Sequence, residues 1–134
     1  MSGLPRSVVQ VFLQRSREAA ALPSLKHLSA DAVVEFIFFP VVNEGCRVVA
    51  ERIVESAADL DIATCLSMGF PAYRGGLMHW ADTYGATYIA KRLRAFALLV
   101  PSHASFFAPC EYLLRCAAAA STLSAGPPAV VAKL

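Results

Sequence analysis

The chain has 134 residues, a formal net charge of +2, 57% hydrophobic residues and only 16% charged residues. This length allows a single domain with its own core, and the mean hydropathy of +0.52 is high for a soluble protein. No apolar run reaches the roughly 18 residues of a membrane-spanning helix, so we expect the surplus apolar surface to contact another protein domain and not lipid. The small charge and the lack of interleaved aromatic and basic residues argue against binding of nucleic acid.

The cysteines and histidines do not have the spacing of a metal site. The four cysteines form no CxxC pair and the three histidines are scattered. We therefore expect reduced, buried thiols in an intracellular compartment. The first residues also lack the apolar region of a secretory signal.

The first half of the chain predicts two helices. Apolar residues over residues 8–20 have the spacing of a weak first helix, and no segment of the chain alternates as a strand would. Ser29 is a good N-cap and Asp31 suits the first turn of a second helix. This helix is expected to continue to about Val54, with a kink at Pro40 because proline removes a backbone hydrogen bond.

Short helices are predicted in the middle of the chain. Ser56 and Asp59 have the spacing of a capping box at the start of one of them, and Gly69 ends it. A second short helix covers residues 77–84. We expect Lys91, Arg92 and Arg94, on the following helix, to form a solvated basic face.

The remaining elements complete a three-part organisation. A long helix is predicted over residues 89–100, and Pro109 suits the first position of a last helix. The expected organisation is an N-terminal helix and linker over residues 1–28, a helical domain over 29–121 and a disordered tail over 122–134.

A search for catalytic groups finds few candidates. The four glycines of the central region do not have the spacing of a dinucleotide fingerprint and no strand precedes them. His79 could act as a general base, although packing beside Trp80 or exposure to solvent is the favoured interpretation. Asp59 and Asp61 could form an acid pair, but helix starts favour carboxylates for structural reasons. We therefore expect no catalytic, cofactor-binding or metal-binding residue in this chain.

Three polar residues have a structural and a functional interpretation. Arg74 is a candidate for contact with a phosphate or carboxylate, while the favoured alternative is a loop arginine that binds backbone carbonyls. Asn43 and Glu44 lie inside the second helix, where they cost free energy if buried unpaired. We expect them to form hydrogen bonds to the short helix or to a neighbouring domain.

Five sequence blocks in combination resemble a known family. They are FLxxxRE (Phe12–Glu18), VVNEGCRV (Val41–Val48), DLDIA (Asp59–Ala63), GFPAYRGGLMHWADTYGA (Gly69–Ala86) and FFAPCEYL (Phe106–Leu113). This set resembles the C-terminal helical domain of 3-hydroxyacyl-CoA dehydrogenases, as in the last domain of the peroxisomal and glyoxysomal multifunctional enzymes of fatty-acid β-oxidation. The resemblance implies an all-α fold like the C-terminal domain of 6-phosphogluconate dehydrogenase, with no Rossmann domain in this chain.

The resemblance also implies that this domain is not catalytic. In the family, the catalytic histidine and glutamate belong to an NAD-binding domain, and multifunctional members have two helical domains that pack together. The helical domain that contributes to the active site has an asparagine five residues before a proline, and Glu35 stands at that position here. The chain alone is therefore expected to be inactive, and NAD and acyl-CoA are implied only for a full-length enzyme.

The implied partner is a sister helical domain or a second copy of the chain. The contacting face in the family is built largely from the first long helix, where apolar residues recur at roughly helical spacing. The interface candidates are Phe36, Ile37, Val41 and Val48.

The last three residues suggest a cellular address. Ala132, Lys133 and Leu134 are similar to the C-terminal tripeptide that the peroxisomal import receptor reads, so we expect a peroxisome, glyoxysome or glycosome. The alternative function is a stand-alone peroxisomal interaction or dimerisation protein derived from this domain, without fatty-acid chemistry.

Overall fold

The fold is all-helical, as expected. A computed structural model describes residues 6–20 and 28–128, and every regular element in these ranges is a helix. The α-helices are α1 (Arg6–Ala20), α2 (Ala30–Ala50), α3 (Ala57–Ser67), α4 (Leu77–Asp82), α5 (Ala86–Leu99) and α6 (Glu111–Ala119), and the short 3₁₀ helices are η2 (Ala72–Arg74) and η3 (Pro101–Phe107). In the described part of the chain, no helix is both long and apolar enough to cross a membrane.

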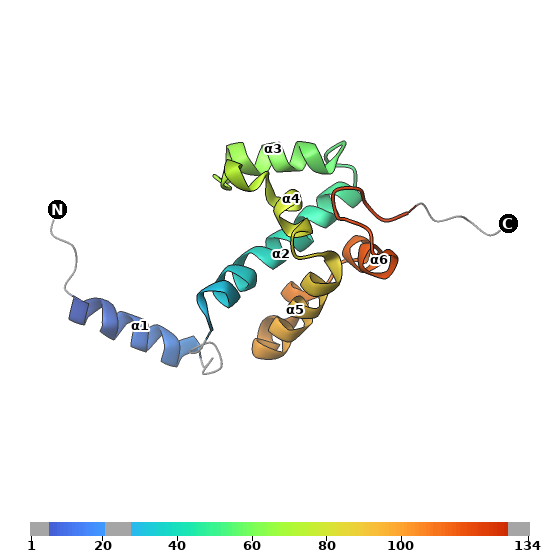
Figure 1. Cartoon of the computed structure of the whole chain (residues 1–134). Coiled ribbons are helices and arrows are strands. Elements are labelled where there is room, and N and C mark those ends of the chain that lie inside the picture. The colour runs from blue at the N-terminus through green and yellow to red at the C-terminus, as the bar shows by residue number, and fades with distance from the viewer. Residues whose placement is uncertain (1–5, 21–27, 129–134) are drawn as a thin grey trace.

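Helix α2 is the centre of the fold. Figure 1 shows it crossing the body obliquely, and it contacts α3, α4, α5 and α6. Phe39, Val42 and Cys46 on α2 are fully buried and belong to one core with residues of all four neighbours. The Trp80 ring of α4 lies 6.1 Å from that of Phe39, so aromatic packing joins the short helix to the centre.

Local capping sets the starts of α2 and α3. The Ser29 hydroxyl accepts a hydrogen bond from the Ala32 backbone N–H at 3.2 Å. Ser56 accepts from the Asp59 backbone N–H at 3.2 Å and donates to the Asp59 carboxylate at 2.7 Å. Both predicted N-caps are confirmed.

Helix α2 ends earlier than the sequence predicts. It passes through Pro40 without interruption and stops at Ala50, not at Val54. Arg52 has a φ of 56°, in the left-handed region that ends helices. At the other end of the chain, α6 starts at Glu111, so Pro109 precedes the helix and does not occupy its first position.

The ordered fold extends beyond the predicted boundary at residue 121. The prediction of disorder from Thr122 onward is wrong for residues 122–128, because Leu123 is fully buried. The Leu123 carbonyl accepts a hydrogen bond from the Tyr112 hydroxyl at 2.8 Å, and the Asp82 carboxylate accepts from the Leu123 backbone N–H at 2.6 Å. The targeting candidates Ala132, Lys133 and Leu134 lie outside the described residues.

Helix α1 differs from the others in its surroundings. Figure 1 shows it apart from the body formed by α2 to α6. Four of its apolar residues are exposed to solvent, namely Val9, Val11, Phe12 and Leu13.

Candidate functional site

Glu35 is held in a closed cluster between α2 and α5. It is 6% exposed, and its carboxylate accepts hydrogen bonds from Arg92 Nε at 2.5 Å and from the Tyr88 hydroxyl at 2.8 Å. The guanidinium of Arg92 also lies 4.7 Å from the centre of the Phe96 ring. The hydrogen bond to Glu35 raises the pKa of Tyr88, because ionisation would place two negative oxygens together. Both carboxylate oxygens of Glu35 are therefore already bound.

This cluster corrects one expectation about α5. The basic residues of that helix were predicted to form a solvated face, whereas Arg92 forms an ion pair and only 28% of its side chain is exposed. Tyr88 and Arg92 are four residues apart and so lie on one face of α5. The sequence contains a signal for the ion pair of Glu35 with Arg92. An acidic residue lies inside an apolar stretch of α2, and two residues that can bind it lie four positions apart on α5.

The interface candidates on α2 differ in exposure. Ile37 is 54% exposed, whereas Phe36, Val41 and Val48 are partly buried and pack against the core. The Phe36 ring, for example, lies 5.2 Å from the Phe96 ring. The interface itself stays a prediction.

Two further residues widen the exposed face around Ile37. Val33 and Val34, which precede Ile37 by one helical turn, are 42% and 41% exposed. They were missing from the predicted set, although their spacing to Ile37 could have indicated them. The exposed apolar face, defined here as Val33, Val34 and Ile37, lies on the part of α2 that includes Glu35.

Asn43 has the structural role that its position predicts, but its partners lie in the segment before α6 and not in the short helix. It is fully buried, its Nδ2 donates to the Ala108 carbonyl at 2.8 Å, and its Oδ1 accepts from the Cys110 backbone N–H at 2.8 Å. It therefore anchors the segment before α6, and these two bonds do not reach the short helix. Glu44 is paired with Arg47 at 2.7 Å on the surface of the same helix.

Asp61 caps a helix other than its own. Its carboxylate accepts hydrogen bonds from the backbone N–H groups of Met78 at 2.6 Å and His79 at 3.3 Å, in the first turn of α4. Gly76 precedes α4 with a φ of 105°, and a Cβ at that position would collide with the Asp61 side chain. Burial raises the pKa of Asp61. The Asp59 carboxylate instead accepts a hydrogen bond from the hydroxyl of Ser56, the N-cap of α3, so the two acids serve different helices.

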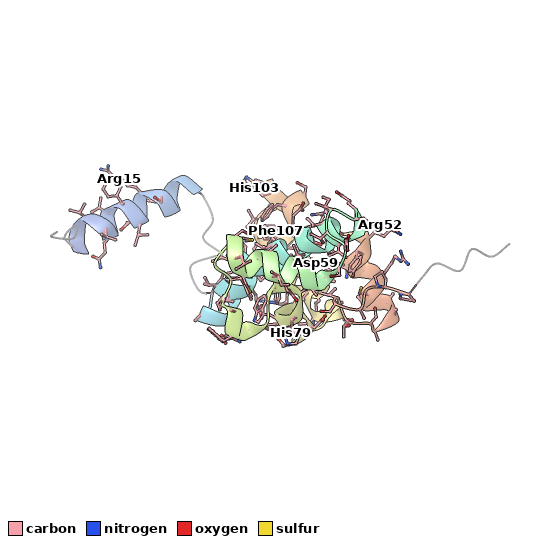
Figure 2. All side chains as sticks on the ribbon, turned by 90° about the horizontal axis from the view of Figure 1, so that it is seen from above. Arg15, Arg52, Asp59, His79, His103 and Phe107 are labelled. Atoms are coloured by element: carbon pink, nitrogen blue, oxygen red, sulfur yellow. The ribbon has the colours of Figure 1, made fainter. Side chains whose placement is uncertain are left out.

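His79 and Arg74 lie at the surface. The imidazole of His79 lies against Gly75 and borders a pocket of about 450 Å³ that Asp61 also lines. Figure 2 shows His79 and His103 at opposite edges of the body. The Arg74 guanidinium lies 5.6 Å from the centre of the Tyr73 ring. Across the described residues, no three His, Cys, Asp or Glu side chains are grouped as a metal site.

The comparisons with known proteins identify the family of the chain. No protein-family model matches it. The glyoxysomal fatty acid beta-oxidation multifunctional protein MFP-a of Cucumis sativus is 46% identical over 124 residues, which are 90% of this chain and 17% of the relative. The chain is homologous to one part of the fatty-acid β-oxidation multifunctional proteins.

Other relatives agree with this family. The peroxisomal multifunctional protein MFP2 of Arabidopsis thaliana is 44% identical over 112 residues, covering 81% of this chain and 15% of the relative. The fatty acid oxidation complex subunit alpha of Shewanella frigidimarina is 34% identical over 88 residues, covering 66% of this chain and 12% of the relative. The resemblance inferred from the five sequence blocks is confirmed, and the all-helical fold is consistent with the C-terminal portion of these enzymes.

Proposed function

We propose that this chain is a non-catalytic domain that supports a 3-hydroxyacyl-CoA dehydrogenase of fatty-acid β-oxidation. Its partner is a sister helical domain or a second copy, and NAD and acyl-CoA bind to other parts of the full-length enzyme. The homology to the multifunctional proteins supports the pathway. The chain spans only 17% of the length of the Cucumis sativus relative. The dehydrogenase activity is therefore proposed for a full-length enzyme and not for this chain.

The surroundings of Glu35 carry this proposal. A residue that contacts substrate needs a polar group directed toward an open site, but Glu35 is buried and both oxygens of its carboxylate are bound, one by Tyr88 and one by Arg92. Separating α2 from α5 would leave this buried carboxylate without its partners, which is costly, so the pair fixes the two helices against each other. At the position where the resemblance implies a catalytic asparagine, this chain joins α2 to α5.

An enzyme assay tests the absence of catalysis. Purified chain mixed with a 3-hydroxyacyl-CoA and NAD is expected to produce no NADH above a blank without protein. The variant Glu35→Asn, which restores the residue that the resemblance implies, should also be inactive, because the NAD-binding domain is still required. Turnover by the wild-type chain that disappears in His79→Ala would overturn the proposal.

A measurement of association tests the supporting role. The exposed apolar face is available for pairing, and closed two-fold pairing is the commonest way to cover such a face. Without a sister domain, we expect the chain to form a dimer in light scattering or sedimentation, and Ile37→Asp should dissociate it. Leu66→Asp is the matched control, because Leu66 is 83% exposed on α3. A monomer at high micromolar concentration, or equal effects of both variants, would contradict this assignment.

The proposal includes import into peroxisomes or the related glyoxysomes and glycosomes. The names of the plant relatives and the C-terminal tripeptide support it. Deletion of Ala132, Lys133 and Leu134 should move a fluorescent fusion from punctate organelles to the cytosol. Cells that lack endogenous multifunctional protein should be used, so that import together with a partner does not hide the effect.

A further inference from the structure

Helix α1 has an apolar side that is exposed to solvent. Val9 and Leu13 are four residues apart and Phe12 follows Val9 by three, so these side chains share one side of the helix. Their exposed fractions are 42% for Val9, 48% for Leu13 and 63% for Phe12. An isolated helix of about 12 to 15 residues is only marginally stable in water, and α1 has 15 residues. Packing of its apolar side against a partner surface would stabilise it.

The exposed apolar face of α2 matches this side of α1 in the reverse direction. From Val9 to Phe12 to Leu13 the intervals along the chain are three and one. Read toward the N-terminus of α2, the three residues of the exposed apolar face follow at the same intervals. Two antiparallel helices would therefore align the two sets residue by residue. Charge favours the same contact, because α1 contains three arginines and one glutamate, whereas the first three turns of α2 contain Asp31, the paired Glu35 and no basic residue.

On the basis of the self-association proposed above, we propose that the exposed apolar face of one chain binds α1 of a second copy, and that the two copies exchange their α1 helices. The position of α1 supports an exchange. Figure 1 shows this helix apart from the body that carries its own face, and both apolar surfaces are left exposed. A reciprocal exchange covers the same two surfaces on each copy and closes with two-fold symmetry.

The area that a stable dimer needs also favours a contact through α1. A stable interface buries about 800 Å² on each partner and involves about 20 to 30 residues a side. The exposed apolar face consists of three residues, none more than 54% exposed, so two such faces that met directly would fall well short of that area. In the exchanged pair, each copy contributes the 15-residue α1 as well as the outer side of the first turns of α2. The contact then has the size expected of a dimer.

Two variants of the full chain and their mixture test the exchange. Phe12→Asp disrupts the apolar side of α1 and leaves the exposed apolar face intact, whereas Ile37→Asp does the reverse. Each variant alone should sediment as a monomer at a concentration where the wild type is a dimer. An equal mixture, with a fluorescent-protein tag on one variant, should form a heterodimer, because α1 of the Ile37→Asp chain can bind the face of the Phe12→Asp chain. Only one of the two contacts is then intact, so this heterodimer should be roughly a hundredfold weaker than the wild-type dimer.

A matched control and three outcomes separate the exchange from other contacts. Gln10→Asp should dimerise as the wild type does, because Gln10 is exposed on α1 two positions before Phe12 and so lies near the opposite side. Far-ultraviolet circular dichroism checks that each variant is folded. A folded Phe12→Asp variant that stays dimeric would overturn the exchange and leave the proposed self-association intact. A mixture that forms no heterodimer would mean that α1 covers the face of its own chain, and would also overturn the exchange. A monomeric wild type would overturn both proposals.

Discussion

The two ends of α2 belong to one continuous helix but have different surroundings. Toward its C-terminus, Val42, Asn43 and Cys46 are fully buried. Toward its N-terminus, Glu35 is bound to α5, while Ile37, two positions away and so on the opposite side of the helix, is 54% exposed. The C-terminal part of α2 with Val42, Asn43 and Cys46, called the enclosed end here, serves the stability of the fold. The N-terminal part, called the open end, has an apolar side that no other described element covers, and this side is the one available to a partner.

The largest expected effect is at the enclosed end. Asn43→Ala removes both hydrogen bonds of a fully buried side chain and leaves the Cys110 N–H without that acceptor. We expect the free energy of unfolding to fall by about 3 kcal/mol in urea titrations followed by circular dichroism. Glu44→Ala is the adjacent control, because its side chain is 66% exposed and its surface pair with Arg47 is worth at most about 0.5 kcal/mol. Equal losses for the two variants would show that the enclosed end is not enclosed in solution.

A smaller loss is expected for the ion pair that joins the open end to α5. Glu35→Ala should lower the free energy of unfolding by about 2 kcal/mol, because Arg92 is left partly buried without its carboxylate. The double variant of Glu35→Ala with Arg92→Ala should be more stable than the sum of the single losses predicts. Additive losses in this double-mutant cycle would mean that the two residues do not interact in solution.

A substitution of Asp61 tests how α3 and α4 are joined, because Asp61 lies on α3 and caps α4. Asp61→Asn keeps the shape of the side chain but removes its charge and titration, and it should weaken the cap on α4 by about 1 kcal/mol at neutral pH. Because burial raises the folded-state pKa of Asp61 above its usual 3.8, the folded protein binds this proton more readily than the unfolded chain. The stability of the wild type relative to Asp61→Asn should therefore increase as the pH falls through the raised pKa toward 3.8. A decrease over that range would indicate that the hydrogen bonds to Met78 and His79 outweigh burial.

The smallest effect is expected on the exposed apolar face. Ile37→Ala should change the free energy of unfolding of the monomer by no more than about 0.5 kcal/mol, because its side chain is already mostly in water. Val42→Ala, at the enclosed end of the same helix, should cost about 2 kcal/mol by leaving a cavity. Thermal unfolding at low protein concentration measures both. A large loss for Ile37→Ala under those conditions would show that the face is covered within a single chain.

The sequence by itself determined the helical fold class, the capped starts of α2 and α3, and the family. Helix starts can be predicted locally, because the groups that form the cap are close in sequence. Ser29 accepts from the backbone three residues later, and Ser56 does the same with Asp59. The family could be recognised because its sequence blocks occur in a specific order, and the comparisons confirmed it.

Only the tertiary structure decided which polar groups meet. Glu35 binds Tyr88 and Arg92, which lie 53 and 57 residues further along the chain, and Asn43 binds Cys110 across 67 residues. Periodicity places each of these residues on a helix face, but the partner depends on how separate helices cross. For the same reason, the packing of Leu123 could not be predicted, because the segment after α6 has no periodic pattern of its own and is held by Tyr112 and Asp82 from the folded body.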